Sequence, residues 1–402
     1  MFLRDFELSR ITPEHLLVDQ PVPWAIYDEF GKLLMAKGSI LRSDRQKEIL
    51  TRVGLFAEEI LPDPESLIPQ PIKFRRKVNP FAEFDELCLK LEEVFKLIEL
   101  ENPNGTVIQK RVYDISTHIQ GLVSYDSDAL LGAVHLADQF PYHVHHPMQI
   151  AVLSELILER LQVEQGVRLS VLAAALTSNI AMNPYQQRLH QQKTPLNDQQ
   201  REVINRHPLQ SVQKLQAAGI EDLLWIELVA QHHEKLDGTG YPRKLEGDAI
   251  RREARILALA DVYTAMVTHR PYRNPIKHKD SLRDIFTQRG SKFDAKLTLL
   301  FLNELGVYPP GVYVRLNNGE LAVVIGRTPD PRSPLVASIK KPDGDLFLSP
   351  RRRNTGSEQF AIRTACNVSE RIKINPATLW GIQAIRVNSM NNADLSGVAD
   401  LI

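Results

Sequence analysis

Apolar residues recur with the period of an α-helix from about residue 81 to residue 305, and this pattern constrains the fold most strongly. The stretch AEFDELCLKLEEVFKLIEL opens a series of amphipathic segments that short breaks separate. Strands would need an alternation with a period of two, which this region lacks. We therefore predict an all-helical domain over residues 81–308.

The pattern before this region is different. In residues 1–61 the stretch VPWAIYDEFGKLLMAKG contains two strand-like runs around Asp28-Glu29-Phe30-Gly31, a composition typical of a hairpin turn. Residues 62–80 hold five prolines and the basic residues Lys73, Arg75, Arg76 and Lys77. We predict a small β-containing N-terminal module over 1–61 and a Pro-rich basic linker over 62–80. The basic residues are interpreted as solvated, with phosphate or partner binding as the alternative.

After Gly306 the pattern becomes strand-like again. The stretch PPGVYVRLNNGELAVVIG places Asn317-Asn318-Gly319 as a turn between two alternating apolar runs. We predict a C-terminal β-containing module over 309–402. The predicted fold class is therefore mainly α, with small β modules at both ends. Further on, Arg351-Arg352-Arg353 lacks a matching downstream motif for an arginine-based nucleotide module, so we predict a solvated loop there.

Composition excludes several classes of function. The 402 residues include 49 Lys and Arg and 49 Asp and Glu, so no overall field attracts nucleic acid or an anionic membrane. The two cysteines, Cys88 and Cys366, form no CxxC pattern, which disfavours a disulfide framework or a thiolate zinc site. No run of about 18 apolar residues is present, and the stretch MFLRDFELSR has no signal-type apolar core. We predict a cytoplasmic protein without a membrane span or a nucleic-acid partner.

Five polar residues fall on the apolar faces of successive predicted helices. Each histidine by itself is most simply a hydrogen-bonded core residue. A buried carboxylate without a cation nearby costs several kcal/mol, roughly, so an inward aspartate together with four inward histidines favours a site, active or vestigial. The five residues are His146, His207, His232, His233 and Asp261.

These residues stand in motifs that resemble the HD-GYP domains, a branch of the HD superfamily of metal-dependent phosphohydrolases. The resemblance runs from about residue 120 to 310 and is carried by HHEKLDGTGYP at 232–242, ADVYTAM at 260–266, RPYR at 270–273, HP at 207–208 and the helix beginning at His146. It implies an HD-type helical domain in a bacterial signalling protein, with cyclic di-GMP or a related cyclic dinucleotide as ligand. It also implies that the four histidines and Asp261 are metal ligands.

The chain departs from this family at its defining His-Asp doublet, where it has Ser178-Asn179. Met182 stands where the family has a lysine, Thr264 replaces a second aspartate, and Tyr142 occupies the position of a glutamate in some members. A bridging carboxylate offsets the repulsion between two dications about 3.5–4 Å apart, and neutral asparagine does not. We therefore expect no binuclear centre and no intact catalytic residue at Ser178, Asn179 or Met182.

Two interpretations of the histidines remain. His207, His232 and His233 match the ligands of one metal position, and three imidazoles are able to hold a single zinc, iron or manganese ion. The alternative is a metal-free cluster in which the imidazoles bond to Asp261, Ser178 and Asn179.

The loop after the histidines is the predicted ligand site. Its glycines permit close approach of a ligand, and the resemblance implies that Tyr241 contacts a guanine while two arginines clamp phosphate. The alternative is that these residues only fold the loop. The predicted ligand-binding residues are Gly240, Tyr241, Pro242, Arg270 and Arg273.

Three functions follow from these alternatives. The first is a receptor for a cyclic dinucleotide, or a regulatory module with a protein partner, without efficient hydrolysis. The second is a phosphodiesterase with a mononuclear or rearranged site. The third is a protein-interaction scaffold that binds no nucleotide.

Overall fold

The computed structural model divides the chain into two compact units, Met1–Ile68 and Pro69–Ile402. The boundary falls within the predicted linker. The structure describes residues 8–381 except for the following positions: 14–15, 23–24, 29–32, 37, 58–67, 75–76, 137–138, 184, 187–188, 190–191, 193, 269–277, 367–371 and 373.

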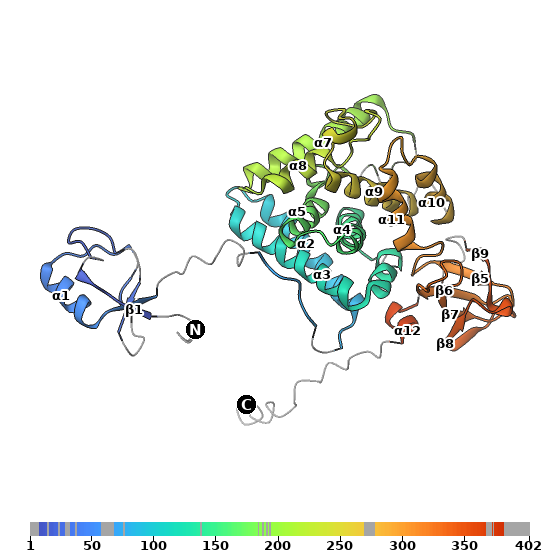
Figure 1. Cartoon of the computed structure of the whole chain (residues 1–402), viewed down its shortest axis with the longest axis horizontal. Helices are drawn as coiled ribbons and strands as arrows, with labels where there is room; N and C mark the ends of the chain where they lie inside the picture. Colours follow the sequence, from blue (N-terminus) through green and yellow to red (C-terminus); the bar gives the residue numbers. More distant parts are fainter. Residues whose placement is uncertain are drawn as a thin grey trace, which may run out of the picture. The chain divides into compact units, whose positions relative to one another are not determined.

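The first unit contains a four-stranded antiparallel sheet and one helix (Figure 1). Its sheet has the order β1-β4-β2-β3, and β2 pairs with β3 as the hairpin pattern predicts, although Glu29, Phe30 and Gly31 of the turn lie outside the described residues. Ser43 caps the helix by accepting a hydrogen bond from Gln46 N. The elements are β1 (Leu8–Arg10), β2 (Ile26–Tyr27), β3 (Leu33–Met35), α1 (Asp44–Val53) and β4 (Leu55–Ala57).

The second unit begins with a layered helical body, and its helices follow the predicted amphipathic segments (Figure 1). Asn79 caps α2 and Pro80 occupies its first turn, while α3 is interrupted at Asp126, where the backbone is not helical. The helices are α2 (Pro80–Ile98), α3 (Gly105–Leu136), α4 (Tyr142–Arg160), α5 (Gln165–Thr177), α7 (Asp198–Ala217), α8 (Leu223–Gln231), α9 (Arg252–Val267), α10 (His278–Thr287) and α11 (Ala295–Leu305), with short 3₁₀ turns η3 (Ile180–Met182) and η4 (Gly247–Ala249).

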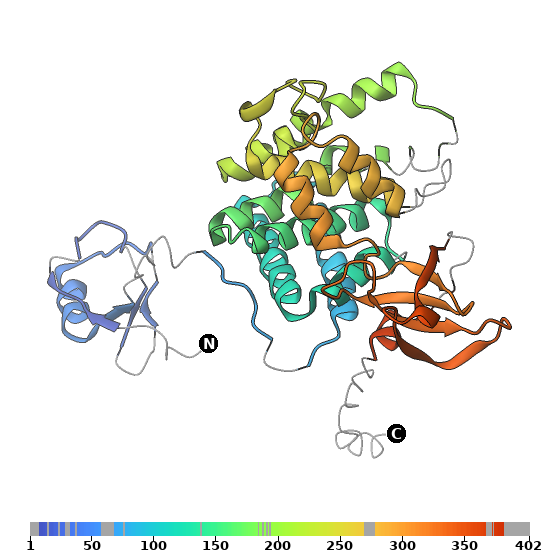
Figure 2. The same cartoon turned by 45° about the vertical axis from the view of Figure 1, so that its right-hand side comes forward.

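A five-stranded antiparallel sheet follows α11, in the order β8-β7-β6-β5-β9 (Figure 2). The predicted turn at 317–319 connects β5 to β6, and Gly319 has a positive φ of 88° there. Its elements are β5 (Tyr313–Leu316), β6 (Leu321–Gly326), β7 (Leu335–Lys340), β8 (Leu346–Asn354), η5 (Glu358–Phe360), β9 (Ile362–Ala365) and α12 (Pro376–Trp380).

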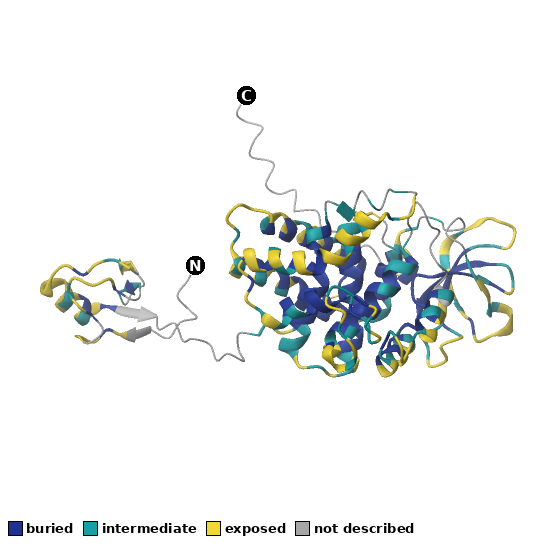
Figure 3. Cartoon of the chain, turned by 90° about the horizontal axis from the view of Figure 1, so that it is seen from above, coloured by how far each residue is buried: buried dark blue, intermediate teal, exposed yellow. Residues whose placement is uncertain are grey.

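Strand β6 is buried on both faces of the sheet, which explains its continuous apolar run, whereas the edge strand β8 is mostly exposed. Val323 and Ile325 pack into the main core with the helices, whereas Ala322 and Val324 pack into a second cluster on the other face. In the helical body, the helices bury their inner faces and expose their outer faces (Figure 3).

The prediction of a mainly helical chain with small β modules at both ends is confirmed. The prediction for 351–353 is wrong, because these arginines lie in strand β8 and pair with β7 rather than forming a loop. Arg353 forms an ion pair with Glu320 at 3.0 Å, and Arg351 lies over the ring of Phe347. Among the described residues, none of the helices has both the length and the apolar character needed to cross a membrane.

Candidate metal and ligand site

Four segments of the helical body bring the five predicted polar residues together. His146 lies in the first turns of α4, His207 lies in α7, and Asp261 lies in α9. His232 and His233 follow directly after the end of α8. Helix α4 begins one turn earlier than the predicted start, at Tyr142, whose ring stacks on His146 with centroids 4.7 Å apart.

A capping box sets the start of α7. The side chain of Asn197 accepts from Gln200 N, and the side chain of Gln200 accepts from Asn197 N. Val203, which lies one turn before His207 on the same helix, is 38% exposed, yet His207 itself is buried. The neighbouring helices, rather than an apolar stripe on α7, therefore bury this imidazole.

Asp261 is the acceptor for two of the imidazoles. His146 Nε2 lies 2.8 Å from Asp261 Oδ1, and His233 Nδ1 lies 3.4 Å from Oδ2. Burial by itself would raise the pKa of Asp261, but the neighbouring His233 and the hydrogen bond from His146 hold it below its ordinary value. The aspartate is therefore ionised at neutral pH, and these interactions offset the cost of its burial.

The tautomers of His207 and His232 follow from their own helices. His207 Nδ1 lies 2.6 Å from Ile204 O, and His232 Nδ1 lies 2.7 Å from Val229 O. A carbonyl oxygen only accepts, so each Nδ1 carries the proton. Burial lowers the pKa of His207 to about 3 and also lowers the pKa of His232, so both rings are neutral. Each Nε2 therefore carries a lone pair.

These two lone pairs face each other, because His207 Nε2 and His232 Nε2 are 3.3 Å apart. Two acceptors at this distance repel unless a cation lies beside both. The potential ligand atoms of His207, His232 and His233 all lie within 4.8 Å of one another, and His233 Nδ1 is directed to Asp261, which leaves its Nε2 available. The donor set of three neutral imidazoles therefore fits one divalent metal ion of the zinc or iron type.

The alternative bonding pattern of these histidines is found only in part, because Asp261 bonds to imidazoles as predicted but, in the part of the chain that the structure describes, Ser178 and Asn179 do not. Within the described residues, Asn179 Nδ2 donates to Ser178 Oγ at 3.2 Å, and neither residue forms a hydrogen bond to an imidazole. His146 Nδ1 is buried without a partner. Thr264 donates to Ala260 O within its own helix. The cluster is thus held by Asp261 and by backbone carbonyls.

A cavity of about 300 Å³ lies beside these residues. Asp261 is the only charged side chain among its described lining residues other than the titratable histidines. The lining comprises Tyr142, His146, Asn179, Met182, Gln186, Leu189, Leu196, Ile204, His207, His233, Tyr241, Asp261 and Ala265. Of the five positions at which the chain departs from the family pattern, Tyr142, Asn179 and Met182 therefore line the cavity, and none of the three carries charge.

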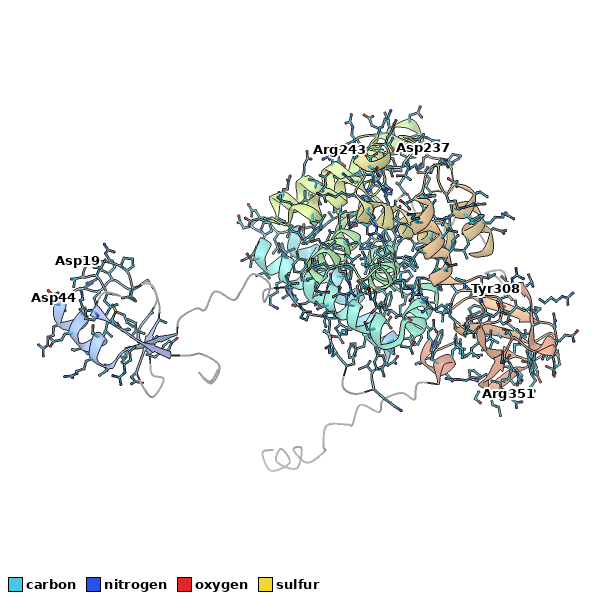
Figure 4. The ribbon with its side chains drawn as sticks, viewed as in Figure 1. Asp19, Asp44, Asp237, Arg243, Tyr308 and Arg351 are labelled. Carbon is cyan, nitrogen blue, oxygen red and sulfur yellow. The ribbon has the colours of Figure 1, made fainter. Side chains whose placement is uncertain are left out.

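The loop after His233 is closely packed against the end of α8. A Cβ on Gly240 would lie 2.4 Å from Lys235 N, so only glycine fits there. Tyr241 lines the cavity, with its ring 4.7 Å from that of His233, and Pro242 follows it. The exposed Asp237 and Arg243 lie at the outer side of this loop (Figure 4).

Glu234 orders this loop and was not predicted. It is 3% exposed, and its carboxylate accepts from Arg243 N at 2.7 Å and from Leu245 N at 3.0 Å. The only signal in the sequence was its place next to the two histidines. Arg270 and Arg273, predicted to bind phosphate, lie outside the described residues.

Comparison with known proteins gives a domain match and several relatives. Residues 133–297 match the family model described as an HD domain. A cyclic di-GMP phosphodiesterase of Pseudomonas aeruginosa is 27% identical over 271 residues, which cover 67% of this chain and 64% of the relative. A cyclic di-GMP phosphodiesterase of Borreliella burgdorferi is 23% identical over 184 residues, or 46% of this chain and 48% of the relative. The chain thus spans less than two thirds of the length of these relatives.

A solved structure titled as an HDG"Y"P protein from Bdellovibrio bacteriovorus also matches. The match covers 74% of this chain and 99% of that chain, with a TM-score of 0.47 and 15% sequence identity.

Proposed function

We propose that the protein is a signalling protein that binds a cyclic dinucleotide without hydrolysing it efficiently, on the basis of the match of residues 133–297 to the HD domain family model. The proposed ligand is cyclic di-GMP or a related dinucleotide, which the names of the relatives support. The observation that carries the proposal is the cavity wall, where Asn179 and Met182 stand beside a cluster that retains its imidazoles.

The loss of hydrolysis follows from the charge of the site. A pair of dications needs a bridging carboxylate, and Asp261 is the one carboxylate that lines the described cavity. It is already engaged by His146 and His233. Asn179 supplies a carbonyl oxygen but no negative charge. The site therefore supports one metal ion at most. This single cation would have to stabilise both the attacking and the leaving oxygen during hydrolysis.

Binding of a phosphate ligand requires positive charge, and the described cavity wall carries none. Ionised Asp261 would repel a phosphate. We propose that one divalent metal held by His207, His232 and His233 supplies that charge, and that Arg270 and Arg273 add to it. When bound, such a metal would polarise a phosphate oxygen. In this arrangement Tyr241 contacts the base, and Gly240 and Pro242 shape the loop that carries it.

A second candidate function is a phosphodiesterase with a mononuclear site. The facing Nε2 atoms of His207 and His232 favour it, because a single metal ion is also able to activate water. A protein-interaction scaffold would need neither the metal nor the cavity.

The experiment is a calorimetric titration of the purified protein with cyclic di-GMP, with and without a chelator. Metal content is determined on the same sample, and the mixture is analysed for linear dinucleotide. We expect binding that the chelator weakens, with about one metal per chain and no product. Rapid product formation would establish the phosphodiesterase instead. Absence of both binding and product would favour the protein-interaction scaffold.

A further inference from the structure

The described residues of the segment 69–79, which are 69–74 and 77–79, lie along α3 and belong to no helix or strand. We refer to this segment as the strap. Ile72 N donates to Thr117 O at 3.2 Å, in the middle of α3. This hydrogen bond ties the backbone of the strap directly to the backbone of α3.

The inward side chains of the strap are apolar. The ring of Phe74 lies 5.5 Å from that of His118 and 5.7 Å from that of Tyr125. Val78 is buried, and its backbone N lies 3.4 Å from the Tyr125 hydroxyl. Lys73 and Lys77, the two described basic residues of the strap, are exposed.

Gly121 provides the space in which the strap sits. A Cβ at this position would lie 2.3 Å from the backbone oxygen of Ile72, too close unless the strap moves away. Glycine in the middle of a helix is less favourable than alanine, because it loses more backbone freedom on folding. Its presence in α3 is therefore explained by the close approach of the strap.

A buried polar cluster holds the beginning of the strap. Gln165 Nε2 donates to Pro69 O and to Gln120 Oε1, each at 2.8 Å. Gln120 lies beside Glu155, which is fully buried and paired with Arg168. Burial raises the pKa of Glu155 to about 7, against the opposing effect of Arg168. The cluster thus contains an ion pair that is sensitive to any change in its packing.

The cluster and the candidate site lie at different ends of the same two helices. Glu155 belongs to α4, which carries His146 nine residues earlier, or roughly 14 Å along the axis. Gln165 begins α5, and Ser178 caps its other end roughly 20 Å away. Helices α4 and α5 pack against each other and against α3. A shift of these helices at the strap end would therefore move residues at the cavity end.

We propose that the strap is a releasable element whose docking on α3 is coupled, through α4 and α5, to ligand binding at the candidate site. The strap is the first segment of the second unit, so it is the covalent route by which the first unit acts on the helical body. The identity of the ligand in this coupling rests on the proposed function. The docking of the strap on α3 is independent of it.

The test uses trypsin on the full chain, because Lys73 and Lys77 are cleavage sites within the strap. Gly121→Ala should displace the strap and raise the cleavage rate about tenfold. Ser124→Ala is the matched control, since Ser124 lies one turn further on α3 and bonds to Glu159 rather than to the strap. Cyclic di-GMP and Zn²⁺ are used separately as probes, and trypsin activity on an unfolded substrate is checked with each.

Coupling between two sites is reciprocal, which makes each result decisive. A saturating probe should change the cleavage rate of the unaltered chain about fivefold, and Gly121→Ala should change the Kd of that probe by the same factor, within typical coupling strengths. Unchanged cleavage of the Gly121→Ala variant would refute the docked strap. Faster cleavage with an unchanged Kd for both probes would refute the coupling.

The outcome also separates this inference from the proposed function. If Zn²⁺ binds and shifts cleavage while cyclic di-GMP does not bind, the ligand assignment fails and the strap coupling stands. If cyclic di-GMP binds without any effect on cleavage, the ligand assignment stands and the coupling fails. If neither probe binds, no site exists to be coupled, and both fail.

Discussion

His207, His232 and His233 present three imidazoles to one side of the candidate site, whereas Asn179 and Met182 present an amide and a thioether to the cavity wall. The first side keeps every feature that metal binding needs: neutral rings, fixed tautomers and converging lone pairs. The second side lacks both charge and strong donor atoms. One side of the cavity thus offers a set of atoms that fits a metal ion under the proposed function, while the other side offers none.

The comparison teaches that ligand binding and hydrolysis place different demands on the same cavity. Affinity for a phosphate requires positive charge, which one metal ion supplies. Stabilising both the attacking and the leaving oxygen is the role of a second metal ion and its bridging acid. The two sides therefore make separate predictions.

Introducing the family's His-Asp doublet on the neutral side should have the largest effect on activity. In the double variant Ser178→His with Asn179→Asp, we expect two metals per chain and hydrolysis of cyclic di-GMP at least ~100-fold above the unaltered chain, because a bridging carboxylate and a further ligand are supplied. Metal analysis and chromatography of the product measure both quantities. Ser178→His alone is the control, since it adds no carboxylate. Two metals already present in the unaltered chain would break the comparison.

Removing a ligand from the histidine side should have the next largest effect. His232→Ala should weaken Zn²⁺ binding about 100-fold or more, since even losses outside the ligand shell cost 10- to 100-fold. Titration against a metal indicator measures the affinity. His143→Ala is the control, because His143 lies on α4 against Phe95 and does not line the cavity. Equal losses in both variants would show that these three histidines hold no metal.

Tyr241 should have a smaller effect, confined to the nucleotide. Stacking of a base on an aromatic ring contributes about 1–3 kcal/mol, so Tyr241→Ala should weaken cyclic di-GMP binding roughly tenfold. Metal content should stay unchanged. Calorimetry measures the loss, and Tyr308→Ala serves as a control outside the cavity. An unaltered Kd would remove Tyr241 from the ligand site.

Buried histidines should also make the stability of the fold depend on pH, which the neutral side of the cavity cannot do. Burial lowers the pKa of His207 to about 3 and that of His145 to about 4, whereas Asn179 does not titrate. The unfolded chain therefore binds more protons between pH 6.5 and 4, and the free energy of unfolding falls as the pH falls through this range. His145→Gln should reduce that slope by up to about 1.4 kcal/mol per pH unit.

Chemical denaturation at several pH values gives the slope. Asn179→Ala is the matched control, because it changes the neutral side without removing a titrating group. The same slope in His145→Gln and in the unaltered chain would show that His145 is not held neutral by its burial.

Much of the fold could be predicted because its signals are local. The helical period over 81–305, the capping box of Asn197 and Gln200, and the turn ending at Gly319 each depend on residues close in sequence. The strand position of Arg351–Arg353 could not be predicted in this way, because it depends on pairing with β7. The docking of the strap in the space left by Gly121 is equally non-local.

The candidate site divides in the same manner. The apolar stripes in the sequence by themselves placed His146, His232 and Asp261 on inward faces, whereas the burial of His207 depends on neighbouring helices. The contacts that set the tautomers of His207 and His232 are local, because each Nδ1 bonds to a carbonyl three residues earlier. Only the tertiary structure decided that the two Nε2 atoms meet at 3.3 Å beside Asp261. That distance depends on how α7, α8 and α9 pack, and packing joins residues that are far apart in the sequence.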